Sequence, residues 1–217
     1  MKQTYYFLRS APYDYILPGR TLYQSFDDVA RRKSDPPLRK NANVLFLEQI
    51  PHISAKQYLV LYAPSKRSKQ TAEFFEKATM REEPLLAEIE YSMQQVIDEE
   101  LFYDSTGKPD IMRARQSFVD SFIHNTLEEP YREVIGRIEK LLDQLKQEQY
   151  STIMLISHGF FLKVIESYIR DKGIVDDPIQ LKFYFTGETE TFHFCEGFIA
   201  EQQNRHVRIL SYVRNKI

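Results

Sequence analysis

The chain has 217 residues, of which 42% are hydrophobic and 28% charged, and its formal net charge is -2 at pH 7. This length suits one domain with a sizeable core, and the balanced charge gives no nucleic-acid-binding footprint. The one cysteine, Cys195, excludes an intrachain disulfide, and no apolar run approaches the roughly 20 residues of a membrane span. We therefore expect a cytoplasmic protein with no signal peptide, nucleic-acid partner or membrane partner.

The predicted elements alternate between strands and helices along the chain. Strand patterns cover residues 4–8, 58–62, 85–89, 152–156 and 207–213, and a hairpin is expected from 181–186 and 189–195 around Gly187-Glu188. Helical periodicity covers residues 26–32, 38–49, 65–78, 128–149 and 160–170. Residues 91–125 lack a strand pattern, so helices and loops are expected there, over one end of the sheet. The alternation predicts an α/β fold, a three-layer sandwich whose mixed, mostly parallel sheet is flanked by helices.

Side chains that can hold an anion stand where predicted strands end. The strand over 152–156 runs into Ser157-His158-Gly159 and then into a helix, so a histidine occupies a strand-to-helix junction. The first strand runs into Arg9-Ser10-Ala11-Pro12, and the second into Ala63-Pro64-Ser65-Lys66-Arg67. An open α/β sheet binds its ligand at the carboxyl ends of its strands, where helix N-termini favour anions. We therefore expect a ligand site at these junctions.

Together, these segments resemble the histidine phosphatase superfamily, which has the phosphoglycerate-mutase-like fold. The family carries Arg-His-Gly or Arg-His-Ala-Pro, Ser-Pro-x-x-Arg-x-x-Gln-Thr-Ala, Leu-x-Glu and Ser-His-Gly segments, which are similar to residues 9–12, 63–72, 86–88 and 157–159 here. Each segment alone is a weak signal, but the order and spacing of all four are specific. The resemblance covers most of residues 3–170. It implies a single histidine-phosphatase-like domain over residues 1–217, with a helical insertion around residues 91–125.

The resemblance implies a site for a phosphate monoester. Arg9 and Arg67 would grip the equatorial oxygens of the phosphoryl group. His158 would donate to the same group, and Glu88 would protonate the leaving oxygen as a general acid. Glu90 stays an alternative, because residues two apart face the same side of a strand. No zinc-type His/Cys spacing and no glycine-rich phosphate loop occurs, so we expect neither a metal nor a cofactor.

Ser10 stands at the position of the family's nucleophilic histidine. Histidine offers an unprotonated ring nitrogen near neutral pH, since its reference pKa is about 6.5, whereas a serine hydroxyl needs a base to take its proton. Tyr13 and Ile16 lie near positions where family members often carry threonine and asparagine, and Ala63 replaces the serine before Pro64. These departures favour a pseudoenzyme that binds a phosphate monoester or a phosphate-like anion, with hydrolysis impaired or absent.

Two alternatives stay open. One is an active phosphohydrolase, of the phosphatase or mutase type, that uses Ser10, a water or another residue as nucleophile. The other is a protein-interaction module with a vestigial pocket and contacts through residues 91–125. For the pseudoenzyme and the active phosphohydrolase, the expected partner is a phosphorylated small molecule or a phosphoprotein. A homodimer through a sheet edge or a helix face is compatible with every reading.

Overall fold

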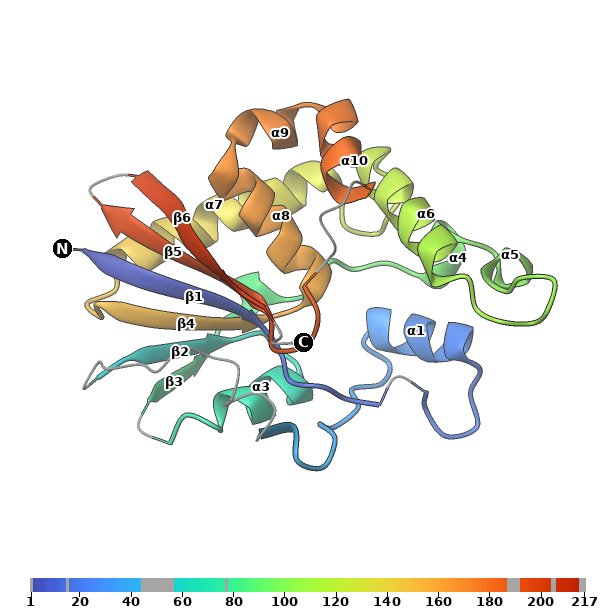
Figure 1. Cartoon of the computed structure of the whole chain (residues 1–217), viewed down its shortest axis with the longest axis horizontal. Helices are drawn as coiled ribbons and strands as arrows, with labels where there is room; N and C mark the ends of the chain where they lie inside the picture. Colours follow the sequence, from blue (N-terminus) through green and yellow to red (C-terminus); the bar gives the residue numbers. More distant parts are fainter. Residues whose placement is uncertain are drawn as a thin grey trace.

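The computed structural model describes residues 2–14, 16–43, 57–76, 78–186, 192–203 and 206–214. Its strands are β1 (Gln3–Arg9), β2 (Leu59–Tyr62), β3 (Thr79–Glu82), β4 (Thr152–Ser157), β5 (Gly197–Gln203) and β6 (His206–Val213). Over the described residues they form one six-stranded sheet in the order β3-β2-β4-β1-β5-β6 (Figure 1). The pairs among β1 to β4 are parallel, whereas β5 pairs antiparallel with β1 and β6 with β5. The predicted mixed, mostly parallel sheet is confirmed.

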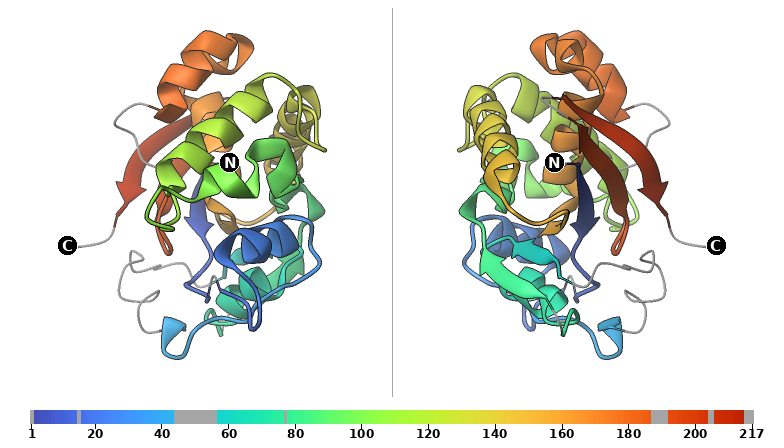
Figure 2. Two further views of the ribbon diagram at one scale, coloured as in Figure 1. Left: turned by 90° about the vertical axis from the view of Figure 1, so that its right-hand side faces the viewer. Right: turned by 90° about the vertical axis from the view of Figure 1, so that its left-hand side faces the viewer.

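Helices cover both faces of this sheet. The helices of the described chain are α1 (Leu22–Ala30), α3 (Lys66–Ala72), α4 (Met93–Val96), α5 (Glu99–Phe102), α6 (Ile111–Ile123), α7 (Tyr131–Gln147), α8 (Gly159–Arg170), α9 (Lys172–Asp176), α10 (Pro178–Thr186) and the short 3₁₀ helix η1 (Pro84–Leu86). Successive side chains of a strand point to opposite faces. Accordingly, Tyr5 and Phe7 join the core with α7 and α8, whereas Leu8 joins the core with α3. The ribbons show α7 and α8 on one face of the sheet and α3 on the other (Figures 1 and 2). The predicted three-layer sandwich is therefore confirmed.

The remaining helices gather at one end of the sheet. In Figure 1, α1, α4, α5 and α6 lie beyond the carboxyl ends of the parallel strands. Phe118 of α6 packs edge-on against Phe160 of α8, with ring centroids 4.3 Å apart, and against Tyr91 at 4.7 Å. Residues 91–125 are therefore helices and loops, as expected, and aromatic contacts join them to the helix that follows β4.

The strand predicted over residues 85–89 is wrong. This segment forms η1 and an extended loop, in which Leu86 and Ile89 are buried without strand pairing. The strand beside β2 is instead β3, all four residues of which are exposed. An edge strand with both faces in water shows no apolar pattern, whereas a loop threaded through the core does.

The predicted terminal hairpin is also wrong. Residues 181–186 belong to the helix α10, where Leu181 and Phe185 are buried one helical turn apart and Phe183 is 80% exposed. Residues 192–195 form a loop, and the expected turn at Gly187-Glu188 lies outside the described residues. The strand that follows, β5, escaped prediction, whereas β6 matches the strand expected over residues 207–213.

Other helix boundaries differ by a few residues. The helix expected at 26–32 is α1, which begins after Thr21 because Thr21 and Gln24 form a reciprocal capping box. The helix expected over 65–78 ends at Ala72. Residues 44–49 of the helix expected over 38–49 lie outside the described residues. Within the part of the chain that the structure describes, no helix has the length and apolar character needed to span a membrane.

Candidate functional site

The pairing of β1 with β4 places two predicted site residues side by side. Arg9 and Ser157 are register partners, and the Ser10 N–H donates to the Ser157 carbonyl at 3.0 Å. Both strands end at this pair, so Ser10 and His158 are the first residues after two neighbouring strands. His158 is also the N-cap residue of α8. The junctions predicted from the sequence therefore meet at one edge of the sheet.

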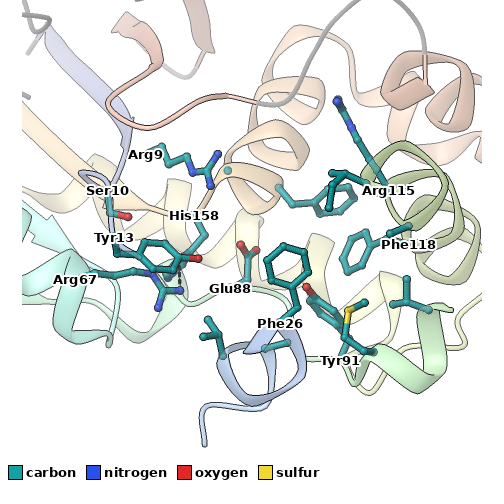
Figure 3. Close-up of a pocket in the computed structure, with 18 residues that line it drawn as sticks. Arg9, Ser10, Tyr13, Phe26, Arg67, Glu88, Tyr91, Arg115, Phe118 and His158 are labelled. Carbon is teal, nitrogen blue, oxygen red and sulfur yellow. Dashed lines mark hydrogen bonds between the residues drawn. The ribbon is translucent and has the colours of Figure 1, made fainter. Parts of the chain in front are cut away.

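A cavity of about 260 Å³ opens at this edge. Its lining includes the five predicted site residues, Arg9, Ser10, Arg67, Glu88 and His158 (Figure 3). Glu90, the alternative to Glu88, instead has its carboxylate 3.9 Å from the Arg32 guanidinium. The fold thus brings the five residues together and separates Glu88 from Glu90.

Arg67 and His158 make a direct contact that sets the state of the imidazole. Arg67 Nη2 lies 3.1 Å from His158 Nδ1. A guanidinium only donates hydrogen bonds, so Nδ1 must accept, and the neutral ring then carries its proton on Nε2. Burial, with the charges of Arg67 and Arg9, holds the pKa of His158 well below its usual range. His158 is therefore a neutral imidazole with an Nε2–H donor.

Arg67 is held in place from several sides. Its Nη1 donates to Asp35 Oδ1 at 3.2 Å, and its Cζ lies 4.8 Å from the centre of the Tyr13 ring. Thr71 Oγ1 donates to the Arg67 carbonyl at 2.7 Å and accepts from the Ala11 N–H at 3.0 Å. These bonds join the first turn of α3 to the loop after β1, so the two segments keep a fixed separation.

Arg9 is oriented by contacts with a different loop. Its Nη1 donates to the Phe192 carbonyl at 2.6 Å, and its Cζ lies 4.2 Å from the centre of the Phe194 ring. The side chain passes close over Gly159, where an added Cβ would lie 3.0 Å from the Phe192 carbonyl oxygen and 3.2 Å from Arg9 Cδ and Nη1. The glycine after His158 thus leaves the room that this guanidinium occupies.

Glu88 lies near the N-terminus of α8, and burial shifts the pKa of its carboxyl group upward. Its Oε1 accepts from the Ile89 N–H at 3.1 Å and from the Phe161 N–H at 3.3 Å. Burial raises the pKa of Glu88, although the Ile89 hydrogen bond and the charges of Arg67 and Arg9 oppose this shift. A carboxyl group with a raised pKa can hold a proton near neutral pH and donate it to a leaving oxygen.

Two buried hydrogen bonds fix the loop that carries Glu88. Ser157 Oγ donates to the Leu86 carbonyl at 2.6 Å, and Arg137 Nη1 donates to the Ala87 carbonyl at 2.8 Å. Arg137 Nη2 also pairs with Glu129 Oε2 at 3.1 Å. Because the loop lies outside the sheet ladder, these side chains replace the strand pairing that its sequence predicted.

Ser10 is almost completely buried, with 1% of its surface exposed, and its hydroxyl makes no hydrogen bond within the described residues. Buried polar atoms are rarely left unpaired, so the bare Oγ beside the cavity is consistent with a site that a ligand or water completes. Among the described residues, no group accepts a hydrogen bond from this hydroxyl in the way that a general base would.

Sequence reasoning missed four residues that hold the arginines and the Glu88 loop: Tyr13, Asp35, Arg137 and Phe194. Tyr13 drew notice only as a departure from the family pattern, and the structure places its ring against Arg67. Arg137 could have been singled out from the sequence, because it lies on the predicted helix that precedes the Ser-His-Gly motif. Asp35 and Phe194 lie in loops, where the sequence gives no signal for their contacts.

A family model described as "Histidine phosphatase superfamily (branch 1)" matches residues 20–178, which is well over half of the chain. The chain belongs to the histidine phosphatase superfamily. The matched residues include Arg67, Glu88 and His158 and begin after Ser10. Among proteins with curated descriptions, none matches this histidine phosphatase relative.

Solved structures of other proteins share the fold. Bacillus stearothermophilus YhfR is 16% identical with a TM-score of 0.63, and the match covers 99% of this chain and 98% of that one. A mycobacterial glucosyl-3-phosphoglycerate phosphatase is 11% identical with a TM-score of 0.62, covering 99% and 100%. Phosphoglycerate mutase from Bacillus anthracis str. Sterne is 14% identical with a TM-score of 0.55, covering 98% and 93%. The phosphoglycerate-mutase-like fold is thereby confirmed.

Proposed function

We propose that this chain binds a phosphate monoester, or a similar anion, and that Ser10 in the nucleophile position leaves hydrolysis impaired or absent. The observation that carries the proposal is the convergence of Arg9, Arg67 and His158 on one cavity. The proposed ligand is a phosphorylated small molecule, the class for which structural neighbours such as glucosyl-3-phosphoglycerate phosphatase and phosphoglycerate mutase are named.

The charges of the cavity suit a phosphate dianion. Two guanidinium groups supply positive charge, and hydrogen bonds from ionised donors to phosphate oxygens are roughly twice as strong as neutral ones. The inferred Nε2–H of His158 adds a donor without a competing acceptor. Burial raises the pKa of Glu88, so this carboxyl group gives up its negative charge more readily than an exposed one does. These features support anion binding at this cavity.

The same contacts argue against turnover through Ser10. A neutral imidazole has one accepting nitrogen, and in His158 that nitrogen faces Arg67. The nitrogen that bears the proton cannot also take the proton of a serine hydroxyl. Ser10 Oγ makes no hydrogen bond to any other described group. An unactivated serine is a poor nucleophile, so these contacts do not support the form of the active-phosphohydrolase alternative in which Ser10 attacks.

Thermal unfolding with inorganic phosphate or vanadate tests the proposal. A ligand at 100 times its Kd stabilises the folded state by about 2.7 kcal/mol, which shifts the Tm of a chain this long by roughly 5–10 °C. Arg67→Met should remove most of the shift. Arg132→Met is the matched control, because Arg132 is exposed on α7 and lies outside the cavity lining. Chloride at equal ionic strength controls for salt.

The two outcomes are distinct. A shift that Arg132→Met keeps and Arg67→Met loses supports the proposed site. No shift, or one that both variants retain equally, contradicts the proposal and leaves the interaction module as the better reading.

A further inference from the structure

The cavity has two chemically different ends. Arg9, Arg67 and His158 line one end, and Glu88 lies between this end and a group of apolar side chains (Figure 3). We call that group the apolar vestibule, and define it as Phe26, Val29, Tyr91, Met93, Ile111 and Phe118. The vestibule draws on α1, the loop after Glu88, α4 and α6. Its residues lie between the four short family motifs and within residues 20–178, which the family model matches.

We propose that the apolar vestibule binds the leaving group of the ligand, and that the ligand is an aryl phosphate or a similarly compact, apolar phosphomonoester. The inference rests on the proposed function, because it takes the phosphoryl group to lie on the arginines. An ester oxygen beside Glu88 then directs the rest of the molecule towards Phe26 and Phe118 (Figure 3). The position of one carboxyl group thus sets which end holds each part of the ligand.

The chemistry of the vestibule separates apolar from polyhydroxylated leaving groups. A sugar hydroxyl that leaves water needs a new partner, and aliphatic and aromatic side chains offer none. An aromatic ring loses no hydrogen bond there and gains from removal of its surface from water. The Tyr91 and Phe118 rings already meet edge-on, with centroids 4.7 Å apart, which is a geometry that a third ring can extend.

Polar groups at this end are few among the described lining residues. Arg115 lines the cavity, and Figure 3 shows its guanidinium extending away from Glu88 and from the Phe26 ring. Burial raises the pKa of the Tyr91 hydroxyl, so this group stays neutral. One neutral hydroxyl and one outward-directed arginine do not replace the several hydrogen bonds that a sugar makes with water.

The walls of the vestibule are tied to one another. Asp27 Oδ1 of α1 accepts from the Met93 N–H at 2.9 Å, and Tyr23 Oη donates to the Ile97 carbonyl at 2.9 Å. Phe26 packs edge-on against Phe102 with centroids 6.0 Å apart. A site whose walls are already in contact loses little freedom when a ligand binds. At about 260 Å³, the cavity lies below the roughly 300–1,000 Å³ of sites for drug-sized ligands, so it suits a small ligand.

Isothermal titration of the unaltered chain separates this inference from the proposed function. The probes are inorganic phosphate, 1-naphthyl phosphate and glucose 6-phosphate. We expect naphthyl phosphate to bind at least about tenfold more tightly than inorganic phosphate, and glucose 6-phosphate to bind no more tightly. Binding of phosphate with equal or tighter binding of glucose 6-phosphate than of naphthyl phosphate overturns the vestibule. Failure of every probe to bind overturns the proposed function and the vestibule with it.

Substitutions locate the discrimination. Phe26→Ala should weaken naphthyl phosphate binding by about tenfold and leave inorganic phosphate unchanged. Because Phe26 also packs on Phe102, a second pair avoids the risk to folding. Ile111 is 46% exposed and lines the cavity, whereas its neighbour Met112 is 60% exposed and does not. Ile111→Ser should weaken naphthyl phosphate by about threefold and Met112→Ser should not, so equal effects of the two contradict the inference.

Discussion

Replacement of Ser10 by histidine is expected to turn this chain into a phosphatase. The other groups of the site are in place: Arg9 and Arg67 for the oxyanion, His158 as a neutral donor and Glu88 as a carboxyl with a raised pKa. The hydroxyl at position 10 lies beside the cavity and makes no hydrogen bond within the part of the chain that the structure describes. A larger side chain there can extend into open space instead of displacing neighbours.

The surroundings of Ser10 set the expected size of two effects of Ser10→His: the loss of stability and the gain in catalytic rate. Enlargement of a packed core residue costs about 1–3 kcal/mol, but the cavity of about 260 Å³ is several times the roughly 30 Å³ that one water occupies. We therefore expect Ser10→His to lower the free energy of unfolding by less than about 1 kcal/mol. Loss of a nucleophile from an intact site costs about 10⁶ in kcat, and this site has other departures, so we expect a gain on the order of 10³. That gain corresponds to about 4 kcal/mol of activation free energy.

Hydrolysis of p-nitrophenyl phosphate, with acid-labile phosphohistidine as a second readout, measures the gain. Ser10→Ala is the matched control, and Ser10→His combined with His158→Ala should return the rate to that of the control. A Ser10→His variant that folds and binds phosphate, yet hydrolyses no faster than Ser10→Ala, would refute the reasoning. Hydrolysis by the unaltered chain that Ser10→Ala abolishes would instead establish the serine as a nucleophile.

Three other predictions concern residues around the proposed phosphate site. Nitrogen NMR should show His158 neutral and protonated on Nε2 at pH about 6. Arg67→Met should raise the pKa of His158, because it removes a neighbouring positive charge. A His158 that titrates near its ordinary value of about 6.5 in the unaltered chain would contradict the buried contact between Arg67 and His158. Since the unfolded chain alone binds this proton below about 6.5, His158 destabilises the fold as pH falls through that value. The folded chain keeps the Glu88 proton to higher pH than the unfolded chain, so the free energy of unfolding falls as pH rises above about 4.5. Glu88→Gln should flatten this fall when the free energy of unfolding is measured by urea titration at several pH values. An unchanged pH dependence in Glu88→Gln would exclude a raised pKa. Gly159→Ala should weaken phosphate binding about tenfold, because the methyl group would crowd Arg9 and the Phe192 carbonyl that accepts its hydrogen bond. Gly136→Ala, whose Cβ meets nothing within 4 Å, should leave binding intact and stabilise α7 by about 0.5–1 kcal/mol. Equal phosphate affinities of the two variants would show that the site tolerates the methyl group at Gly159.

The central part of the fold was predictable because burial and chemistry coincide there. β1, β2 and β4 are short apolar runs, and each leads directly to a polar junction. The register of β1 with β4 brings those junctions together without any long-range signal in the sequence. Four short segments in a fixed order therefore predicted Arg9, Arg67, Glu88 and His158 as site residues, and the structure places all four around one cavity.

The periphery was less predictable, because its stability comes from neighbours. β3 has four exposed residues and exists through its pairing with β2, whereas the apolar segment with Leu86 and Ile89 is a loop held by side-chain hydrogen bonds. In the site, the proton on His158 depends on Arg67, which is 91 positions away. The Tyr13 and Phe194 contacts depend on loop paths in the same way. Periodicity and motifs carry no information on such pairs.

A crystal structure with orthovanadate tests the central claim most directly. We predict that vanadate lies in the cavity, with oxygens in hydrogen-bond contact with both guanidinium groups, of Arg9 and Arg67, and with His158 Nε2. Ser10 Oγ should be the protein atom that faces the vanadium atom of the bound vanadate. Vanadate bound elsewhere, or a cavity that stays empty at saturating vanadate, would contradict the account.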